Sequence, residues 1–112
     1  MTVRELAESG IAAAVCEGDR MEREITVPFC CDLLSIAMGK APEGCAWVTV
    51  MANMNTLAVA SLADAACIVL AEGVHLDAAA LQKAAQQGIT VLGTEQPVFE
   101  TALAIYERMK AG

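Results

Sequence analysis

Short apolar runs alternate with helical patterns along most of this chain. Each apolar run ends in polar turn residues, and amphipathic or alanine-rich stretches follow, which is typical of repeated strand–helix units. The expected strands occupy residues 11–16, 24–29, 46–51, 66–70 and 89–92. The expected helices occupy residues 2–9, 32–38, 56–62, 78–87 and the segment that follows Pro97.

This order of elements predicts the fold class. Strands joined through helices pair in parallel, so we expect one domain over residues 1–112, a three-layer α/β/α fold with a mostly parallel sheet of about five strands. The run 11–16 is apolar throughout, so we expect both faces of that strand to be buried. The run 24–29 contains Pro28, which cannot donate a ladder hydrogen bond and therefore belongs at a sheet edge.

Side chains that can accept hydrogen bonds mark the expected starts of helices. Asp32 precedes the second helix, Asn53 and Asn55 precede the third, and Asp77 precedes the fourth. Each is expected to accept a hydrogen bond from a free backbone N–H of the first turn. Gly88 is expected to end the fourth helix in the left-handed conformation.

Composition and charge narrow the possible partners. Hydrophobic residues make up 56% of the chain and aromatic residues only 4%. So many small apolar residues favour an exposed patch that forms a homodimer interface, although an alanine-rich core of closely packed helices explains them as well. The formal net charge of −7 disfavours nucleic acids and anionic membranes as partners.

The termini and cysteines predict a cytoplasmic protein. The opening MTVRELAESG is too polar for a signal peptide, and polar residues interrupt the uncharged stretch from residue 45 to residue 63, so no membrane span is expected. The five cysteines are odd in number and include no Cys-x-x-Cys spacing, and four lie in apolar runs. This usage predicts reduced, buried thiols.

A ligand site is expected where the carboxyl ends of the parallel strands meet. The candidate ligand-binding residues follow three of the strands: Asn53, Asn55, Thr56, Glu72, Thr94 and Glu95. A helix start offers free N–H groups and a positive dipole, which favour a small anionic ligand such as a nucleotide. The alternative is that the asparagines only cap the helix. No standard glycine-rich phosphate loop is present.

Catalytic chemistry has little support in the sequence. His75 is the only histidine, which excludes a histidine-based metal cluster, and beside Glu72 it is more often a bystander than a base. Cys30 and Cys31 precede a helix start, where a dipole can lower a thiol pKa, so a redox switch and a simple packing role both stay open. We expect no catalytic residues, no metal and no cofactor.

Several phrases of the sequence are shared with one known family. These short sequence segments are CDLLS after the edge strand, AWVTV in the third strand, and the pair CIVLAEG and ITVLGTE. Together they resemble the DRTGG domain family over nearly the whole chain, from about Val3 to Tyr106. The resemblance implies a fold similar to the N-terminal domain of HPr kinase, without its kinase activity. The Asp-Arg-Thr-Gly-Gly signature is replaced by MANMNT at residues 51–56, so only its position carries over.

The family resemblance shapes the functional prediction. Its members occur as regulatory modules in larger proteins and as small separate chains, some encoded beside hydrogenase-like genes. We therefore expect a non-enzymatic regulatory module that forms a homodimer and binds a small anionic ligand or nucleotide near Asn53 and Asn55. The alternatives are a ligand-free docking module for a redox enzyme, and a redox switch at Cys30 or Cys31.

Overall fold

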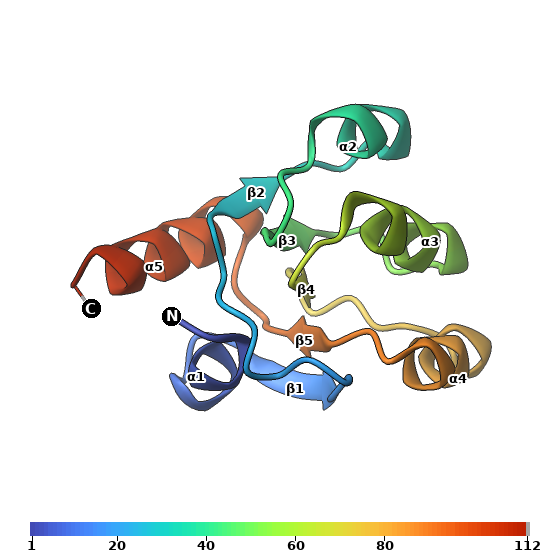
Figure 1. The fold of residues 1–112 in the computed structure, drawn as a ribbon, viewed down its shortest axis with the longest axis horizontal. Coiled ribbons are helices and arrows are strands. Elements are labelled where there is room, and N and C mark those ends of the chain that lie inside the picture. The colour runs from blue at the N-terminus through green and yellow to red at the C-terminus, as the bar shows by residue number, and fades with distance from the viewer. Residues whose placement is uncertain (112) are drawn as a thin grey trace.

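Five strands and five helices occupy residues 1–111, the part of the chain that the computed structural model describes (Figure 1). The strands are β1 (Ala13–Cys16), β2 (Pro28–Cys30), β3 (Ala46–Thr49), β4 (Cys67–Leu70) and β5 (Val91–Gly93). The helices are α1 (Val3–Glu8), α2 (Leu34–Lys40), α3 (Met54–Ala63), α4 (Ala78–Gln87) and α5 (Val98–Ala111). The predicted order of elements is confirmed.

The strands form one mixed sheet in the order β1-β5-β4-β3-β2. From β2 to β5 the strands are parallel neighbours, and a helix joins each strand to the next. Only β1 runs antiparallel, beside β5, so the predicted mostly parallel sheet is confirmed. All four parallel strands finish at the same end of the sheet, called the carboxyl end below. Ala13 at the start of β1 also lies there, because it is opposite Gly93.

Helices cover both faces of the sheet. In Figure 1, α2, α3 and α4 lie on one face, and α1 and α5 lie on the other. Side chains of the central strands alternate between the two apolar cores, as the period of a strand requires. Trp47 and Ile68 face the helices α2 to α4, whereas Val48 and Val69 face α1 and α5. The arrangement is the expected three-layer α/β/α fold.

The first strand differs from its prediction. β1 is an edge strand, and Ala13, Ala14 and Val15 are exposed, so the expectation of burial on both faces is wrong. The reason is that burial depends on how many neighbours a strand has, which an apolar run does not specify. The edge position predicted from Pro28 is confirmed, since β2 is the opposite edge strand.

Two of the predicted helix caps are confirmed. Asn53 accepts a hydrogen bond from the N–H of Thr56 at 3.1 Å, and Asp77 accepts one from the N–H of Ala80 at 2.8 Å. Asn55 does not cap α3; it lies within the first turn of this helix and is exposed. One cap residue is enough, because the chain becomes helical immediately after Asn53.

The predicted cap at Asp32 is wrong. The N-cap residue of α2 is Leu33, whose side chain makes no capping hydrogen bond. The Asp32 carboxylate instead accepts hydrogen bonds from the Thr49 hydroxyl at 2.7 Å and the Val50 N–H at 3.0 Å. It therefore secures the loop after β3, where the strand ladder has ended and these donors need a partner.

No helix within residues 1–111 is long and apolar enough to cross a membrane. The uncharged stretch from residue 45 to residue 63 folds as β3, a polar turn and α3, as the sequence predicts.

Candidate functional site

The loops that follow β4 and β5 are joined at the carboxyl end of the sheet. The N–H of Glu72 donates to the carbonyl of Gln96, and the N–H of Gly73 donates to the carbonyl of Thr94, both at 2.9 Å. Glu72 and Gly73 have left-handed backbones, with φ of 59° and 72°. That conformation costs a side-chain-bearing residue about 1–2 kcal/mol, which the two hydrogen bonds help to offset. The paired loops thus form a fixed platform.

A pocket of about 230 Å³ opens beside this platform. Its apolar wall consists of Ala13, Ala14, Val15, Leu70, Val74 and Leu76. Three polar residues also line it: His75, Thr94 and Glu95. The Glu95 carboxylate lies over Gly73, where an added Cβ would stand 2.7 Å from Oε1. Apolar concavities with a few convergent polar groups are the usual form of ligand sites.

The six predicted ligand residues lie in two places. Thr94 and Glu95 line the pocket, and the exposed Glu72 belongs to the adjoining platform. The other three belong to the start of α3 and do not line this pocket: Asn53, Asn55 and Thr56. The sequence did not point to β1 as part of the site, because the position of this strand beside β5 has no local signal.

The start of α3 uses its polar groups internally. Asn53 accepts from the Thr56 N–H, and the Thr56 hydroxyl donates to the carbonyl of Met51 at 2.8 Å. Thr56 is buried, so its hydroxyl faces the protein. These bonds are what the capping alternative expects. The exposed side chain of Asn55 remains as a donor for the predicted anionic ligand.

Acidic residues dominate the carboxyl end of the sheet. The segments between the parallel strands and the helices that follow them contain no lysine or arginine: residues 31–33, 50–53, 71–77 and 94–97. All four acidic side chains are exposed: Asp32, Glu72, Asp77 and Glu95. The Asp32 and Asp77 carboxylates accept hydrogen bonds from other residues of the protein. Helix dipoles offset only about half a charge each. Four helices begin at this end, so their dipoles together offset about two charges, and the electrostatic preference is local: at the pocket, the Glu95 carboxylate favours cationic and hydrogen-donating groups.

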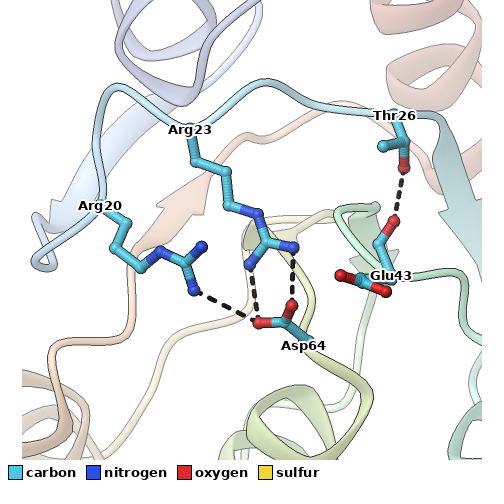
Figure 2. A network of polar contacts seen from close by, with 5 residues as sticks. All are labelled: Arg20, Arg23, Thr26, Glu43 and Asp64. Carbon is cyan, nitrogen blue, oxygen red and sulfur yellow. Dashed lines mark hydrogen bonds and ion pairs between the residues drawn. The ribbon is translucent and has the colours of Figure 1, made fainter.

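At the opposite end of the sheet, a largely buried arginine forms an ion pair with an exposed aspartate. The Arg23 guanidinium donates to both oxygens of Asp64, at 2.7 and 2.8 Å, and Arg20 adds a contact at 3.4 Å (Figure 2). The hydrogen bonds from Arg23 lower the pKa of Asp64. Nearby, the Thr26 hydroxyl donates to the carbonyl of Glu43 at 2.8 Å. Together these contacts join the loop before β2 to the turn that precedes β3 and to the turn that follows α3. Their role is structural.

The cysteines are all free, but most are not buried. Only Cys45 and Cys67 are buried, whereas Cys16 and Cys31 are half-buried and Cys30 is exposed. The prediction of buried thiols is therefore correct for two of the five. The others belong to β1 and β2 or their flanks, and these strands lie at the sheet edges.

Cys30 lacks the electrostatics of a reactive thiol. Partial burial and then the negative charge of Asp32 raise the pKa of Cys30. The Cys31 thiol lies 3.3 Å from the carbonyl of Leu33, and the Cys31 carbonyl accepts a hydrogen bond from Nε1 of Trp47 at 3.0 Å. The expected lowering of a thiol pKa by a helix dipole is not found at Cys30.

A cluster of metal-binding side chains is not found among the described residues. No three His, Cys, Asp or Glu side chains gather into a possible metal site within residues 1–111. His75 is exposed at the pocket, and over the same range no hydrogen bond joins it to a serine or cysteine. The pocket lining contains no serine or cysteine.

Comparison with known proteins does not identify the chain: no family model matches it, and no curated protein matches it. The resemblance to the DRTGG family stays a prediction.

Proposed function

We propose that this chain is a non-enzymatic regulatory module whose ligand binds in the pocket at the carboxyl end of the sheet. The observation that carries the proposal is the preformed pocket of about 230 Å³, held open beside the hydrogen-bonded loops of Glu72 and Thr94. Binding alone needs no nucleophile–base pair, and none is found in the pocket lining. The resemblance to the DRTGG family supports a regulatory role.

The lining of the pocket indicates the chemistry of the ligand. Val74 and Leu76 offer apolar surface, and Glu95 offers a carboxylate with no lysine or arginine in the surrounding loops. A ligand with an apolar body and a cationic or hydrogen-donating group matches this lining. The predicted anionic ligand or nucleotide is a separate hypothesis, for which Asn55 and the first N–H groups of α3 are the available donors.

Paired probes of opposite charge test the proposal. Hexylamine and hexanoate share an apolar body, and adenosine and AMP differ by one phosphate. With ¹⁵N-labelled protein, we expect hexylamine to shift the amide resonances of residues 74–76 and 93–95, and hexanoate to leave them unchanged. Glu95→Gln should weaken the response. Glu100→Gln is the matched control, because Glu100 is an exposed acid of the first turn of α5 that does not line the pocket.

Two results would overturn this assignment. The first is that no probe shifts the pocket resonances. The second is that AMP alone acts, on residues 53–56 and not on the pocket, and that Asn55→Ala abolishes the effect. The second result would support the anion site at the start of α3.

A docking role is the second candidate, favoured by an exposed apolar stripe on α5. Phe99, Leu103 and Tyr106 recur at helical spacing and are 69%, 40% and 46% exposed. A different side of the helix packs on the core through Val98, Ala102, Ile105 and Met109, as the sequence pattern predicts. The stripe is a suitable contact for the predicted homodimer or for a partner enzyme.

A further inference from the structure

β1 is an edge strand that carries no charged residue and no proline, although it is short and contains a bulge, two features that limit edge pairing. It pairs with β5 on one side, and no strand of residues 1–111 lies on its other side (Figure 1). Ala13, Ala14 and Val15 are exposed, and the run 11–16 contains no charged residue and no proline. Edge strands that stay unpaired commonly carry lysine or proline. β2, at the opposite edge, begins with Pro28.

The candidate pocket adjoins this free strand. Ala13, Ala14 and Val15 form part of its wall together with Val74 and Leu76. A strand added beside β1 would point every second side chain toward the same face, at intervals of roughly 7 Å. One such side chain can enter the pocket while the main chain pairs with β1.

A bulge in β1 limits how much of the strand is available. Ala14 is opposite Leu92 and Cys16 is opposite Val91, so Val15 is an extra residue. Bulges interrupt regular pairing and re-aim side chains. An added strand can therefore form only a few main-chain hydrogen bonds here, and contacts in the pocket must contribute much of its affinity.

The negative charges near β1 indicate what kind of partner can bind at this edge. Glu8 and Glu17 flank β1 on either side, and Arg4 interacts with both of them. Glu8 ends α1 and Glu17 follows β1, so a second copy would bring further negative charges to the same edge, which disfavours it. Glu95 in the pocket lining adds a further negative charge. An extended segment with a basic residue is complementary to Glu95, because the pocket lining contains no lysine or arginine.

We propose that β1 is a docking edge for an extended, basic segment of a partner protein. The segment adds to the sheet as a sixth strand, places an apolar side chain in the pocket and directs a lysine or arginine to Glu95. The proposal rests on the function proposed above and identifies the ligand of the pocket as a peptide.

Synthetic peptides test the chemistry of this partner. The probe is fluorescein-labelled Thr-Val-Lys-Val-Lys-Val-Thr, and its counterpart carries glutamate at both lysine positions. By fluorescence anisotropy we expect the basic peptide to bind and the acidic one to bind at least about tenfold more weakly. Glu95→Gln should weaken the binding of the basic peptide by about two- to fivefold, as expected for the loss of one exposed ion pair worth up to about 1 kcal/mol. The control Glu100→Gln should change nothing.

N-methylated peptides test strand pairing without altering the protein. In an extended peptide, the backbone N–H groups of alternate residues point to opposite edges. One version of the basic peptide is N-methylated at the residues whose N–H groups point to one edge, and a second version at the residues whose N–H groups point to the other edge. Only one edge of an added strand faces β1, so one version should lose binding and the other should keep it. Equal binding of both versions, or equal binding of the acidic peptide, overturns the proposal.

Two further outcomes separate this proposal from the proposed function. Failure of every peptide, with a positive hexylamine result, overturns strand addition and leaves the pocket as a small-molecule site. Failure of both sets of probes removes the proposed function too. A wild-type dimer that Ala14→Lys dissociates in light scattering would assign the edge to a second copy, which also overturns the proposal.

Discussion

Removal of the Asp64 carboxylate would show how much its ion pair with Arg23 stabilises the fold. Asp64→Asn is the suitable change, because it removes the charge and nearly keeps the side-chain size. Asp64 ends α3 in the left-handed conformation, with φ of 58°. Asparagine adopts this conformation readily, whereas alanine would add strain of about 1–2 kcal/mol and obscure the effect.

The exposure of the two partners sets the expected magnitude. Arg23 is 13% exposed, so its charge has lost most of its water, but Asp64 is 45% exposed and remains screened. The pair therefore lies between a surface ion pair, worth about 0–1 kcal/mol, and hydrogen bonds to charged groups, worth about 1.5–3 kcal/mol. We expect Asp64→Asn to lower the free energy of unfolding by about 1–2 kcal/mol. A double-mutant cycle with Arg23→Gln should give a coupling of about 1 kcal/mol.

Urea unfolding followed by the fluorescence of Trp47 measures these free energies, since Trp47 is the only tryptophan and is fully buried. Arg20→Gln is the matched control. Arg20 is 63% exposed and contacts Asp64 at 3.4 Å, so its loss should cost less than about 0.5 kcal/mol.

The dependence on pH gives a second test. The hydrogen bonds from Arg23 hold the pKa of Asp64 below its ordinary value of 3.8, so its stabilisation is complete above that value and is lost as pH falls through the lowered pKa. The difference in unfolding free energy between wild type and Asp64→Asn should be constant from about pH 7 to pH 5 and should close below about pH 4. A difference that persists unchanged in acid, or a coupling below about 0.3 kcal/mol, would refute the reasoning.

The remaining predictions concern the apolar stripe of α5 and the thiols. In light scattering, Leu103→Glu should convert the predicted homodimer to a monomer, whereas Ile36→Glu, at a similarly exposed position on α2, should leave the mass unchanged; a monomeric wild type would contradict the predicted homodimer. A thiol reagent at pH 8 should modify at most three cysteines of the native protein. Burial raises the pKa of Cys45 to about 11 and that of Cys67 to about 12, so their reaction before unfolding would contradict the structure.

The sequence by itself was enough to locate most elements, because the signals involved act over a few residues. Asp77 caps α4 through the N–H of Ala80, and Gly88 ends the same helix with φ of 68°, both as predicted. Pro28 predicted an edge strand because the missing N–H is a property of that residue alone.

The candidate site was predictable only in part. Thr94 and Glu95 directly follow β5, so the rule that ligands bind at the carboxyl ends of parallel strands finds them. The apolar wall from Ala13 to Val15 comes from a strand about eighty residues earlier in the chain, and the local sequence does not specify which strands pair over such a separation. The local sequence pattern predicts neither the bulge at Val15 nor the position of β1 beside β5.

Tertiary structure decided which partner each side chain and strand obtained. Asp32 has helix N–H groups close by in sequence, but it binds Thr49 and Val50, which the packing of β3 beside β2 brings within reach. β1 and β4 are both apolar runs, but β4 has neighbours on both sides and β1 on one. Local patterns specify backbone conformation and apolar faces. The strand order, and with it the free edge and the pocket, depends on the free energy of packing the whole chain.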